Sequence, residues 1–326
     1  MSITLFFPGL VEDAFRDTLF FKKAKASKVT SPRPKGILSE LLQQPEHQFS
    51  YFSCLFRSFD SLAGKLESPE HYLVLSPCHL AADLKTLHLQ AISPLEPAEI
   101  EELQSAVSEF LRADAMTIDA VGENHWLLRW PEPIDYQQNS IMELGLGPLS
   151  SDEASGIDKG KVNRLQSELQ MLLHQHPVNQ RRAANGKNAI NAFWLWRDPI
   201  SPASKSTSFD LIAGDELLRG LTAREHSSNQ SAPEGNAASN GNTALTDLLQ
   251  APQQFEEVLK NSKNTLIGSH DLLSLSNPEW LEHVPKCLDE FASTLFNRLG
   301  QTITLVTHEN QYCLRPWYQR WPLWKK

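Results

Sequence analysis

The stretch GKVNRLQSELQMLLHQHPVNQRRAANGKNAINAFWLWR, from Gly160 to Arg197, decides the fold. Its first part predicts a helix with one apolar stripe facing a sheet. Large apolar residues recur there at steps of three and four, namely Val162, Leu165, Leu169, Leu172 and Leu173. From Ile190 to Trp196 nearly every residue is apolar, which predicts a strand covered on both faces in a parallel sheet.

Two stop signals lie between that helix and that strand. Pro177 predicts the end of the helix and a turn after it, because its ring clashes with the preceding turn and moves His176 out of the helical region. Asn185-Gly186 predicts a second stop, since both residues tolerate the left-handed conformation.

Strand and helix signals on both sides of this stretch predict an α/β fold with a mostly parallel sheet flanked by helices. The strands are predicted at Ile3–Phe7, Phe209–Ala213, Asn264–Ser269 and Thr302–Thr307. Helices are predicted at Leu38–Leu66, Leu217–Ala223, Leu245–Leu259 and Glu279–Leu299. The basic residues 22–35 predict an exposed loop, and the polar residues 226–242 predict a disordered loop.

A smaller α+β subdomain is predicted over residues 66–148. Pro97 opens a helix with apolar residues at three- and four-residue steps, and Thr117–Val121 and His125–Trp130 then resemble a hairpin. Residues 1–65 and 149–326 are assigned to the main α/β domain.

Charge and composition limit the classes of partner. A formal charge of −9 over 326 residues and the absence of a long Lys/Arg run argue against a nucleic-acid binder. No stretch approaches the roughly 20 apolar residues that span a bilayer, so we expect no membrane partner. The four cysteines form no CxxC motif, and the N-terminus has no basic region of a signal peptide. These features predict reduced thiols in a cytoplasmic protein.

Residues Glu168–Trp196 resemble the signature of a bacterial family whose members are described as RpfE-type regulatory proteins and phosphoglycerate mutase-like proteins. The matching pieces are QMLLH, HPVN, a basic pair, a glycine, an Asn-containing strand start and WLW. Ser76–Leu80, Leu217–Leu221 and the aromatic C-terminus extend the similarity over most of the chain. This resemblance implies a regulatory protein.

The same stretch is more distantly similar to the archaeal-type cofactor-independent phosphoglycerate mutases. Their series of His-Pro-x-Asn, Arg, Gly, Ala-Asn and a strand is matched here by His176–Asn179, Arg182, Gly186, Ala189–Asn191 and Arg197. The resemblance implies an alkaline phosphatase-like fold, which is a three-layer sandwich of a mostly parallel sheet flanked by helices, with a smaller α+β subdomain.

The resemblance also implies which residues ought to bind metal. Such mutases hold two divalent metals with Asp and His at strand ends, and their first strand ends in Asp-Gly, where this chain has Pro8-Gly9. Their last strand is followed by Asp-His and a further His, where this chain has His308-Glu309 and no later histidine. We therefore expect no metal cofactor and no mutase activity. The alternative is a rearranged set that binds a divalent metal such as Mn or Zn, formed by His270, Asp271, His308 and Glu309.

The ligand-binding hypothesis is a pocket for a small anionic metabolite at the strand ends. Guanidinium groups offer fixed donors to phosphate or carboxylate, and Asn offers both a donor and an acceptor. The candidates are His174, His176, Asn179, Arg182, Asn191 and Arg197, with His79 and Asp83 as a further pair four residues apart. The structural alternative is that His176 and Asn179 cap the helix and hold the turn, while Asn191 satisfies buried backbone groups.

Three classes of function follow. The first is a catalytically degenerate phosphoglycerate mutase-like protein with a regulatory or metabolite-binding role. The second is an active metal-dependent phosphotransferase or isomerase that uses the rearranged ligand set. The third is a structural module that binds a protein partner, or itself, through the tryptophan-rich tail at residues 315–326.

Overall fold

The computed structural model describes residues 2–6, 16–28, 34–43, 45, 49–63, 66–82, 86–90, 92–122, 124–144, 148–149, 154–200, 211–214, 216–222, 264–268, 302–307 and 310–314. They belong to two compact units. Unit 1 contains the described residues up to Phe49 and those from Leu211 onward, and unit 2 contains the described residues from Ser50 to Ile200.

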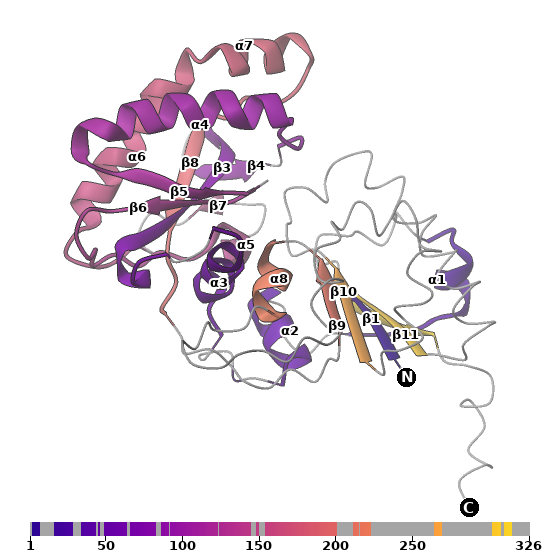
Figure 1. Cartoon of the computed structure of the whole chain (residues 1–326). Helices are drawn as coiled ribbons and strands as arrows, with labels where there is room; N and C mark the ends of the chain where they lie inside the picture. The colour runs from indigo at the N-terminus through magenta and orange to yellow at the C-terminus, as the bar shows by residue number, and fades with distance from the viewer. Residues whose placement is uncertain are drawn as a thin grey trace, which may run out of the picture. The chain divides into compact units, whose positions relative to one another are not determined.

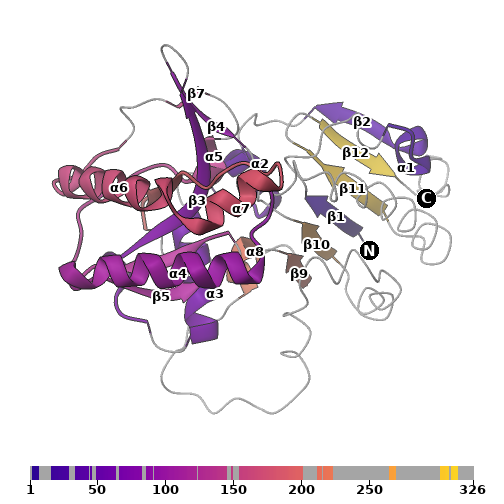
Figure 2. The same ribbon diagram turned by 90° about the horizontal axis from the view of Figure 1, so that it is seen from above.

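The described strands of unit 1 form a six-stranded sheet with the order β2-β12-β11-β1-β10-β9 (Figure 2). Their bounds are Ser2–Phe6 for β1, Lys25–Lys28 for β2, Leu211–Gly214 for β9, Asn264–Gly268 for β10, Thr302–Val306 for β11 and Asn310–Leu314 for β12. β1 pairs in parallel with β10 and β11, and β10 pairs in parallel with β9. β12 and β2 add antiparallel strands at one side. The predicted strands and their mostly parallel pairing are confirmed for this sheet.

Three described helices belong to unit 1: α1 (Leu19–Lys23), α2 (Pro34–Leu41) and α8 (Glu216–Thr222). α8 follows β9 directly, which confirms the predicted strand–turn–helix step. Residues 22–28 are largely exposed, as expected, but they are not a loop, because α1 and β2 occupy residues 19–28. The Phe21 ring of α1 packs 5.5 Å from the Tyr312 ring of β12, and the lysine-rich β2 closes the sheet edge.

The predicted helices at 245–259 and 279–299, the predicted disordered loop at 226–242 and the C-terminal tail lie outside the described residues. The structure does not test these predictions.

Unit 2 contains a second sheet, in which every described strand pair is antiparallel. The strand order is β5-β6-β3-β4-β7, and β8 pairs with β3. The bounds are Tyr72–Ala82 for β3, Leu87–Gln90 for β4, Thr117–Val121 for β5, Trp126–Arg129 for β6, Pro148–Leu149 for β7 and Ala192–Trp196 for β8. β5 and β6 form the predicted hairpin.

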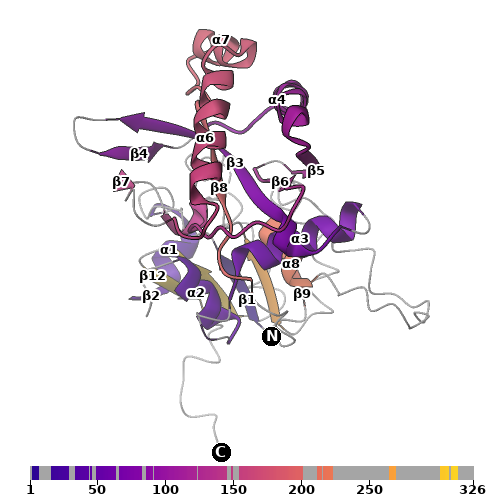
Figure 3. The ribbon, with the colours of Figure 1, turned by 90° about the vertical axis from the view of Figure 1, so that its left-hand side faces the viewer.

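Helices cover both faces of this sheet. α4 (Pro97–Leu111) and α6 (Lys159–His174) lie on one face, and α3 (Tyr51–Ala63) lies on the other (Figures 1 and 3). α4 starts at Pro97 as predicted, behind a capping box formed by Glu96 and Glu99. The predicted stripe of α6 is buried in one core with residues of α4 and the sheet, since Val162, Leu165, Leu169 and Leu173 all belong to that core.

The N-terminus of α3 is capped from a distant part of the chain. The carboxylate of Asp198 accepts hydrogen bonds from the Ser50 hydroxyl and from the backbone N–H groups of Tyr51 and Phe52. The helix predicted over 38–66 is interrupted, because α2 ends at Leu41 and α3 begins only at Tyr51.

The direction of β8 differs from the prediction. All five of its residues are buried, which confirms that both of its faces are covered. Its partner is nevertheless antiparallel, with Val74–Cys78 of β3 opposite Trp196–Ala192. A continuous apolar run indicates that both faces of a strand are covered, but it does not indicate the direction of the neighbouring strands. Here helices cover both faces of an antiparallel sheet.

The stop at Pro177 also differs in detail. α6 ends at His174, but Pro177 then starts a second helix, α7 (Pro177–Ala184), instead of a turn. Proline is favoured at a first helical position because that N–H has no partner within the helix. His176 has the predicted extended conformation, and Gly186, with φ of 69°, confirms the second stop signal.

The two compact units are divided differently from the expected main domain of residues 1–65 and 149–326 and subdomain of residues 66–148. β3 pairs both with β6, which lies inside residues 66–148, and with β8, which lies outside them. Strand pairing therefore joins the Gly160–Arg197 stretch to the antiparallel sheet of unit 2, whereas we expected it in the main domain. Among the described helices, none is long and apolar enough to cross a lipid bilayer.

Candidate functional site

Four of the predicted ligand-binding residues gather around one short segment, Asn188–Asn191, which leads into β8. Arg182 Nε donates to the carbonyl of Asn188 at 2.8 Å, and Nδ1 of His79 lies 2.7 Å from the carbonyl oxygen of Ala189. The side chains of Asn179 and Asn191 hold the next two positions. The residues of the sequence signature therefore hold in place the segment that leads into β8.

Asn179 is buried and uses both ends of its amide. Its Nδ2 donates to the carbonyls of Leu173 and Ile190 at 2.8 and 2.7 Å, and its Oδ1 accepts the Ile190 N–H at 2.7 Å. One side chain thereby joins the end of α6, the start of α7 and Ile190, which lies two residues before β8. This is the structural alternative that the sequence left open, because a buried amide is stable only when its donors and acceptors are satisfied.

Asn191 continues the β3–β8 ladder with its side chain. Its Oδ1 accepts the Leu80 N–H at 2.8 Å, and its Nδ2 donates to the Leu80 carbonyl at 2.8 Å. Its own backbone N–H donates to Cys78. The side-chain amide of Asn191 thus forms the two hydrogen bonds to Leu80 that a peptide group would form, at the point where the backbone pairing of β8 stops.

Arg182 is the central cation of a ladder of ion pairs between α4 and the α7 region. Its side chain is 0% exposed, and its Nη1 lies 2.8 Å from Oε2 of Glu99. Its Nη2 donates to the Ser93 carbonyl at 2.9 Å. The guanidinium is closed off from solvent, and its donors are engaged by Glu99 and by backbone carbonyls.

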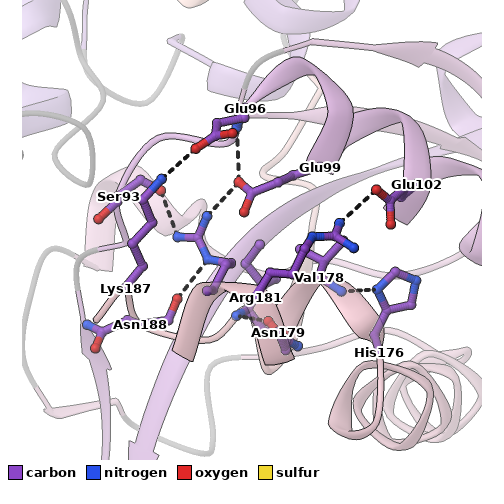
Figure 4. A network of polar contacts seen from close by, with 12 residues as sticks. Ser93, Glu96, Glu99, Glu102, His176, Val178, Asn179, Arg181, Lys187 and Asn188 are labelled. Atoms are coloured by element: carbon purple, nitrogen blue, oxygen red, sulfur yellow. Dashed lines mark hydrogen bonds and ion pairs between the residues drawn. The ribbon is translucent and has the colours of Figure 1, made fainter. Parts of the chain in front are cut away.

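Two exposed pairs flank this buried one. Glu96 pairs with Lys187 and Glu102 pairs with Arg181, each at 2.7 Å. Figure 4 shows Glu96, Glu99 and Glu102 along α4, facing Lys187 and Arg181. The sequence contained the signal for this ladder, namely acids at steps of three on a predicted helix and three cations near Pro177. Nothing in the spacing showed that the two sets meet.

Arg197 follows β8 and is also buried. Its Nη1 donates to the carbonyls of Glu70 and Tyr72, and its Nη2 donates to the carbonyl of Ile134. Burial lowers the pKa of this guanidinium, while the charges of Asp135 and Glu70 act in the opposite direction. Arg197 thus binds backbone oxygens from three segments of unit 2.

The two histidines lie at the junction of α6 and α7. His174 is exposed in the last turn of α6. His176 is the N-cap of α7, where its Nδ1 accepts the Val178 N–H at 3.3 Å. Partial burial lowers the pKa of His176. The neutral ring is the form that can accept this bond.

The remaining predicted residues cannot be placed. Asp83, the partner proposed for His79, lies outside the described residues, as do His270, Asp271, His308 and Glu309. Within the part of the chain that the structure describes, no three His, Cys, Asp or Glu side chains converge as a metal site. Cys54, Cys78 and Cys313 are free thiols, and burial raises the pKa of Cys54 and of Cys78 to about 12.

The parallel strands of unit 1 end together at one edge of their sheet. Phe6 of β1 pairs with Gly268 of β10 and with Val306 of β11, and Gly268 pairs with Gly214 of β9. In open α/β sheets ligands bind at the carboxyl edge. The sequence continues from these strand ends with Pro8-Gly9, Asp215, His270-Asp271 and His308-Glu309.

No family model matches the sequence, and no curated protein matches it. The RpfE-type resemblance therefore stays a prediction. Among solved structures, the chain is similar to the PH0037 protein from Pyrococcus horikoshii, with 12% identity, a TM-score of 0.45 and coverage of 96% of this chain and 87% of that one. It is also similar to the cofactor-independent phosphoglycerate mutase from Thermoplasma acidophilum, with 13% identity, a TM-score of 0.39 and coverage of 96% and 89%. The chain thus has a distant structural similarity to phosphoglycerate mutase-like proteins.

Proposed function

We propose that this chain is a phosphoglycerate mutase-like protein of alkaline phosphatase-like fold that has lost the two-metal site and binds a small anionic metabolite in a regulatory role. The binding site in this proposal is the carboxyl edge of the parallel strands of unit 1. The observation that carries it is the register of those strands, which ends β1, β9, β10 and β11 at one edge.

The position of β1 supports the loss of the metals. β1 lies between β10 and β11, so its carboxyl end at Phe6 is in the middle of the edge. In the sequence, Phe7 and then Pro8-Gly9 follow that end, where the mutases that the sequence resembles have Asp-Gly. A proline side chain offers no ligand atom. Two-metal phosphoryl transfer needs ligands that clamp both the attacking and the leaving oxygen, and a missing central carboxylate weakens that clamp.

The buried arginines support placing the ligand at this edge. The guanidinium groups of Arg182 and Arg197 donate to Glu99 and to backbone carbonyls in unit 2. Releasing either guanidinium to a ligand leaves several buried carbonyls without donors, which costs about 1–3 kcal/mol for each group. Their contribution is therefore to the fold.

One observation favours a second candidate, an active metal-dependent phosphotransferase or isomerase. Gly268 and Val306 pair with the same residue, Phe6, from opposite sides. In the sequence, His270-Asp271 and His308-Glu309 each begin two residues after these paired strand ends, and the two strands are separated by β1. Imidazoles and carboxylates from two such strands are suited to a divalent metal such as Mn or Zn.

One set of measurements separates the two candidates. The purified full-length chain is assayed for bound Mn and Zn, for mutase and phosphomonoesterase turnover with either metal added, and for calorimetric binding of 3-phosphoglycerate and inorganic phosphate. The proposal expects saturable binding of a phosphate compound without turnover. Turnover that needs metal and is lost in His308→Ala, but kept in the exposed-residue control His174→Ala, overturns it in favour of the enzyme. Absence of both binding and turnover overturns both candidates.

A further inference from the structure

A pocket with a volume of about 300 Å³ opens in unit 2 beside the first half of α6. Its apolar part is formed by Met116, Trp130 and Leu165. Met116 and Leu165 are 5% and 3% exposed and belong to the core, and Trp130 packs against that core. Sites for small ligands combine apolar side chains with polar groups that fix the orientation of the ligand.

The polar groups around this lining carry charges of both signs. Lys161, Arg164 and Glu168 come from successive turns of α6, and Asp114 comes from the 3-10 helix η4 (Arg112–Asp114). The lining therefore holds two cations and two carboxylates. None of these four residues was a candidate in the sequence analysis.

Several of these charged groups retain unused bonding capacity. The side-chain carboxylate of Asp114 forms no hydrogen bond and no ion pair with another residue that the structure describes, although its charge acts on Arg164. Arg164 uses only Nε, at 2.8 Å from Glu168, out of the five N–H groups of a guanidinium. Lys161 pairs with Asp158 at 2.7 Å and keeps donors to spare.

The backbone around Asp114 holds the residue in a defined place. Ala115 has the left-handed conformation, with φ of 55° and ψ of 25°, and its N–H donates to Arg112 at 3.2 Å. The next residue, Met116, donates its N–H to Leu111 at 3.3 Å. Asp114 and Met116, on either side of a residue in an unfavourable conformation, both line the pocket. Such backbone is retained when the surrounding structure fixes it.

We propose that this pocket binds a free α-amino acid with an apolar side chain. The ligand ammonium group pairs with Asp114, its carboxylate pairs with Arg164 and Lys161, and its side chain covers Met116, Trp130 and Leu165. Complementary charge decides between ligand classes here. An anion or a cation of similar shape meets a like charge on this lining, whereas a zwitterion finds an opposite charge for each of its ends. This site is separate from the strand edge of unit 1.

Calorimetry on the full-length chain tests the proposal with L-phenylalanine and two analogues, phenylpropionate, which lacks the ammonium group, and phenethylamine, which lacks the carboxylate. L-phenylalanine is expected to bind, and each analogue is expected to bind at least about tenfold more weakly. Asp114→Asn and Arg164→Gln are each expected to weaken L-phenylalanine binding by about tenfold. The matched control is Arg112→Gln, since Arg112 lies two residues from Asp114 and pairs with Glu109 at 3.3 Å without lining the pocket.

Circular dichroism establishes that each variant is folded before binding is measured. Saturable binding of L-phenylalanine that both pocket variants weaken and the control preserves supports the proposal. No saturable binding of L-phenylalanine or L-leucine at millimolar concentration overturns it. It is also overturned if either analogue binds as tightly as the amino acid, or if the control weakens binding as much as Asp114→Asn does.

Discussion

The Asp198 carboxylate and the Ser50 hydroxyl are 2.9 Å apart, although the two residues are separated by 148 positions in the sequence. The same carboxylate accepts the N–H groups of Tyr51 and Phe52, each at 2.9 Å. A negative charge at the N-terminus of α3 satisfies N–H groups that have no partner within the helix and complements the helix dipole.

Asp198→Ala is expected to lower the free energy of unfolding by roughly 2 kcal/mol, because it removes a buried cap and leaves N–H groups without acceptors. Urea titration followed by circular dichroism measures the loss. Asp198→Asn keeps an oxygen acceptor and should lose less. The control Glu109→Ala removes an exposed carboxylate and should change stability by less than about 0.5 kcal/mol. An equal loss in both alanine variants contradicts the assignment of a cap.

The ion-pair ladder of α4 allows a comparison within one helix. Glu99→Ala leaves the fully buried Arg182 without its counter-charge and is expected to cost roughly 3 kcal/mol. Glu102→Ala, one step along the same face, removes an exposed partner of Arg181 and should cost less than about 1 kcal/mol. Chemical denaturation of both variants under identical conditions gives the difference. Similar losses at the two positions are incompatible with a buried Arg182.

His176 makes the stability of unit 2 depend on pH. Its pKa is lowered in the folded chain by partial burial, so the unfolded state binds the proton more readily. The contribution of the cap is fully present above the unfolded pKa of about 6.5 and is lost as the pH falls towards the lower folded pKa. His176→Asn keeps an N-cap side chain that does not titrate. Its stability should therefore decline less than that of the unmodified chain between about pH 8 and about pH 5.

Urea midpoints across that pH range measure this effect. His174→Asn is the matched control, since His174 is an exposed histidine two residues earlier that caps no helix. A His176→Asn variant whose pH dependence equals that of the control contradicts the role of the neutral ring.

Two glycines near the start of α6 should differ in the effect of replacement by alanine: one replacement should lower the stability of the chain and the other should raise it. Gly156 has φ of 104°, and an added Cβ would lie 2.2 Å from the Asp135 carbonyl oxygen, so Gly156→Ala is expected to cost at least about 2 kcal/mol. Gly160 lies in the first turn of α6 with nothing within 4 Å of an added Cβ, so Gly160→Ala should add about 0.5 kcal/mol. Melting temperatures of the two variants test both signs. A stabilised Gly156→Ala rules out the tight turn.

The sequence predicted the elements whose signals are local. Pro97 predicted the start of α4, and Thr117–Val121 with His125–Trp130 predicted the hairpin of β5 and β6. The sequence did not predict the antiparallel pairing of β8, because the burial of Ala192–Trp196 does not depend on strand direction. The site was harder still. Arg182 and Asn191 have the chemistry of ligand-binding residues, and their partners Glu99 and Leu80 lie 83 and 111 positions away.

The meeting of Ser50 and Asp198 also has a topological consequence. Ser50 and Asp198, close to the first and the last described residues of unit 2, are in contact, and such a segment behaves as an insertion with nearly closed ends. Joining those ends by a short linker orders few additional residues, so the entropy of loop closure stays small. A circularly permuted unit 2, with new termini in an exposed turn, should therefore retain its fold.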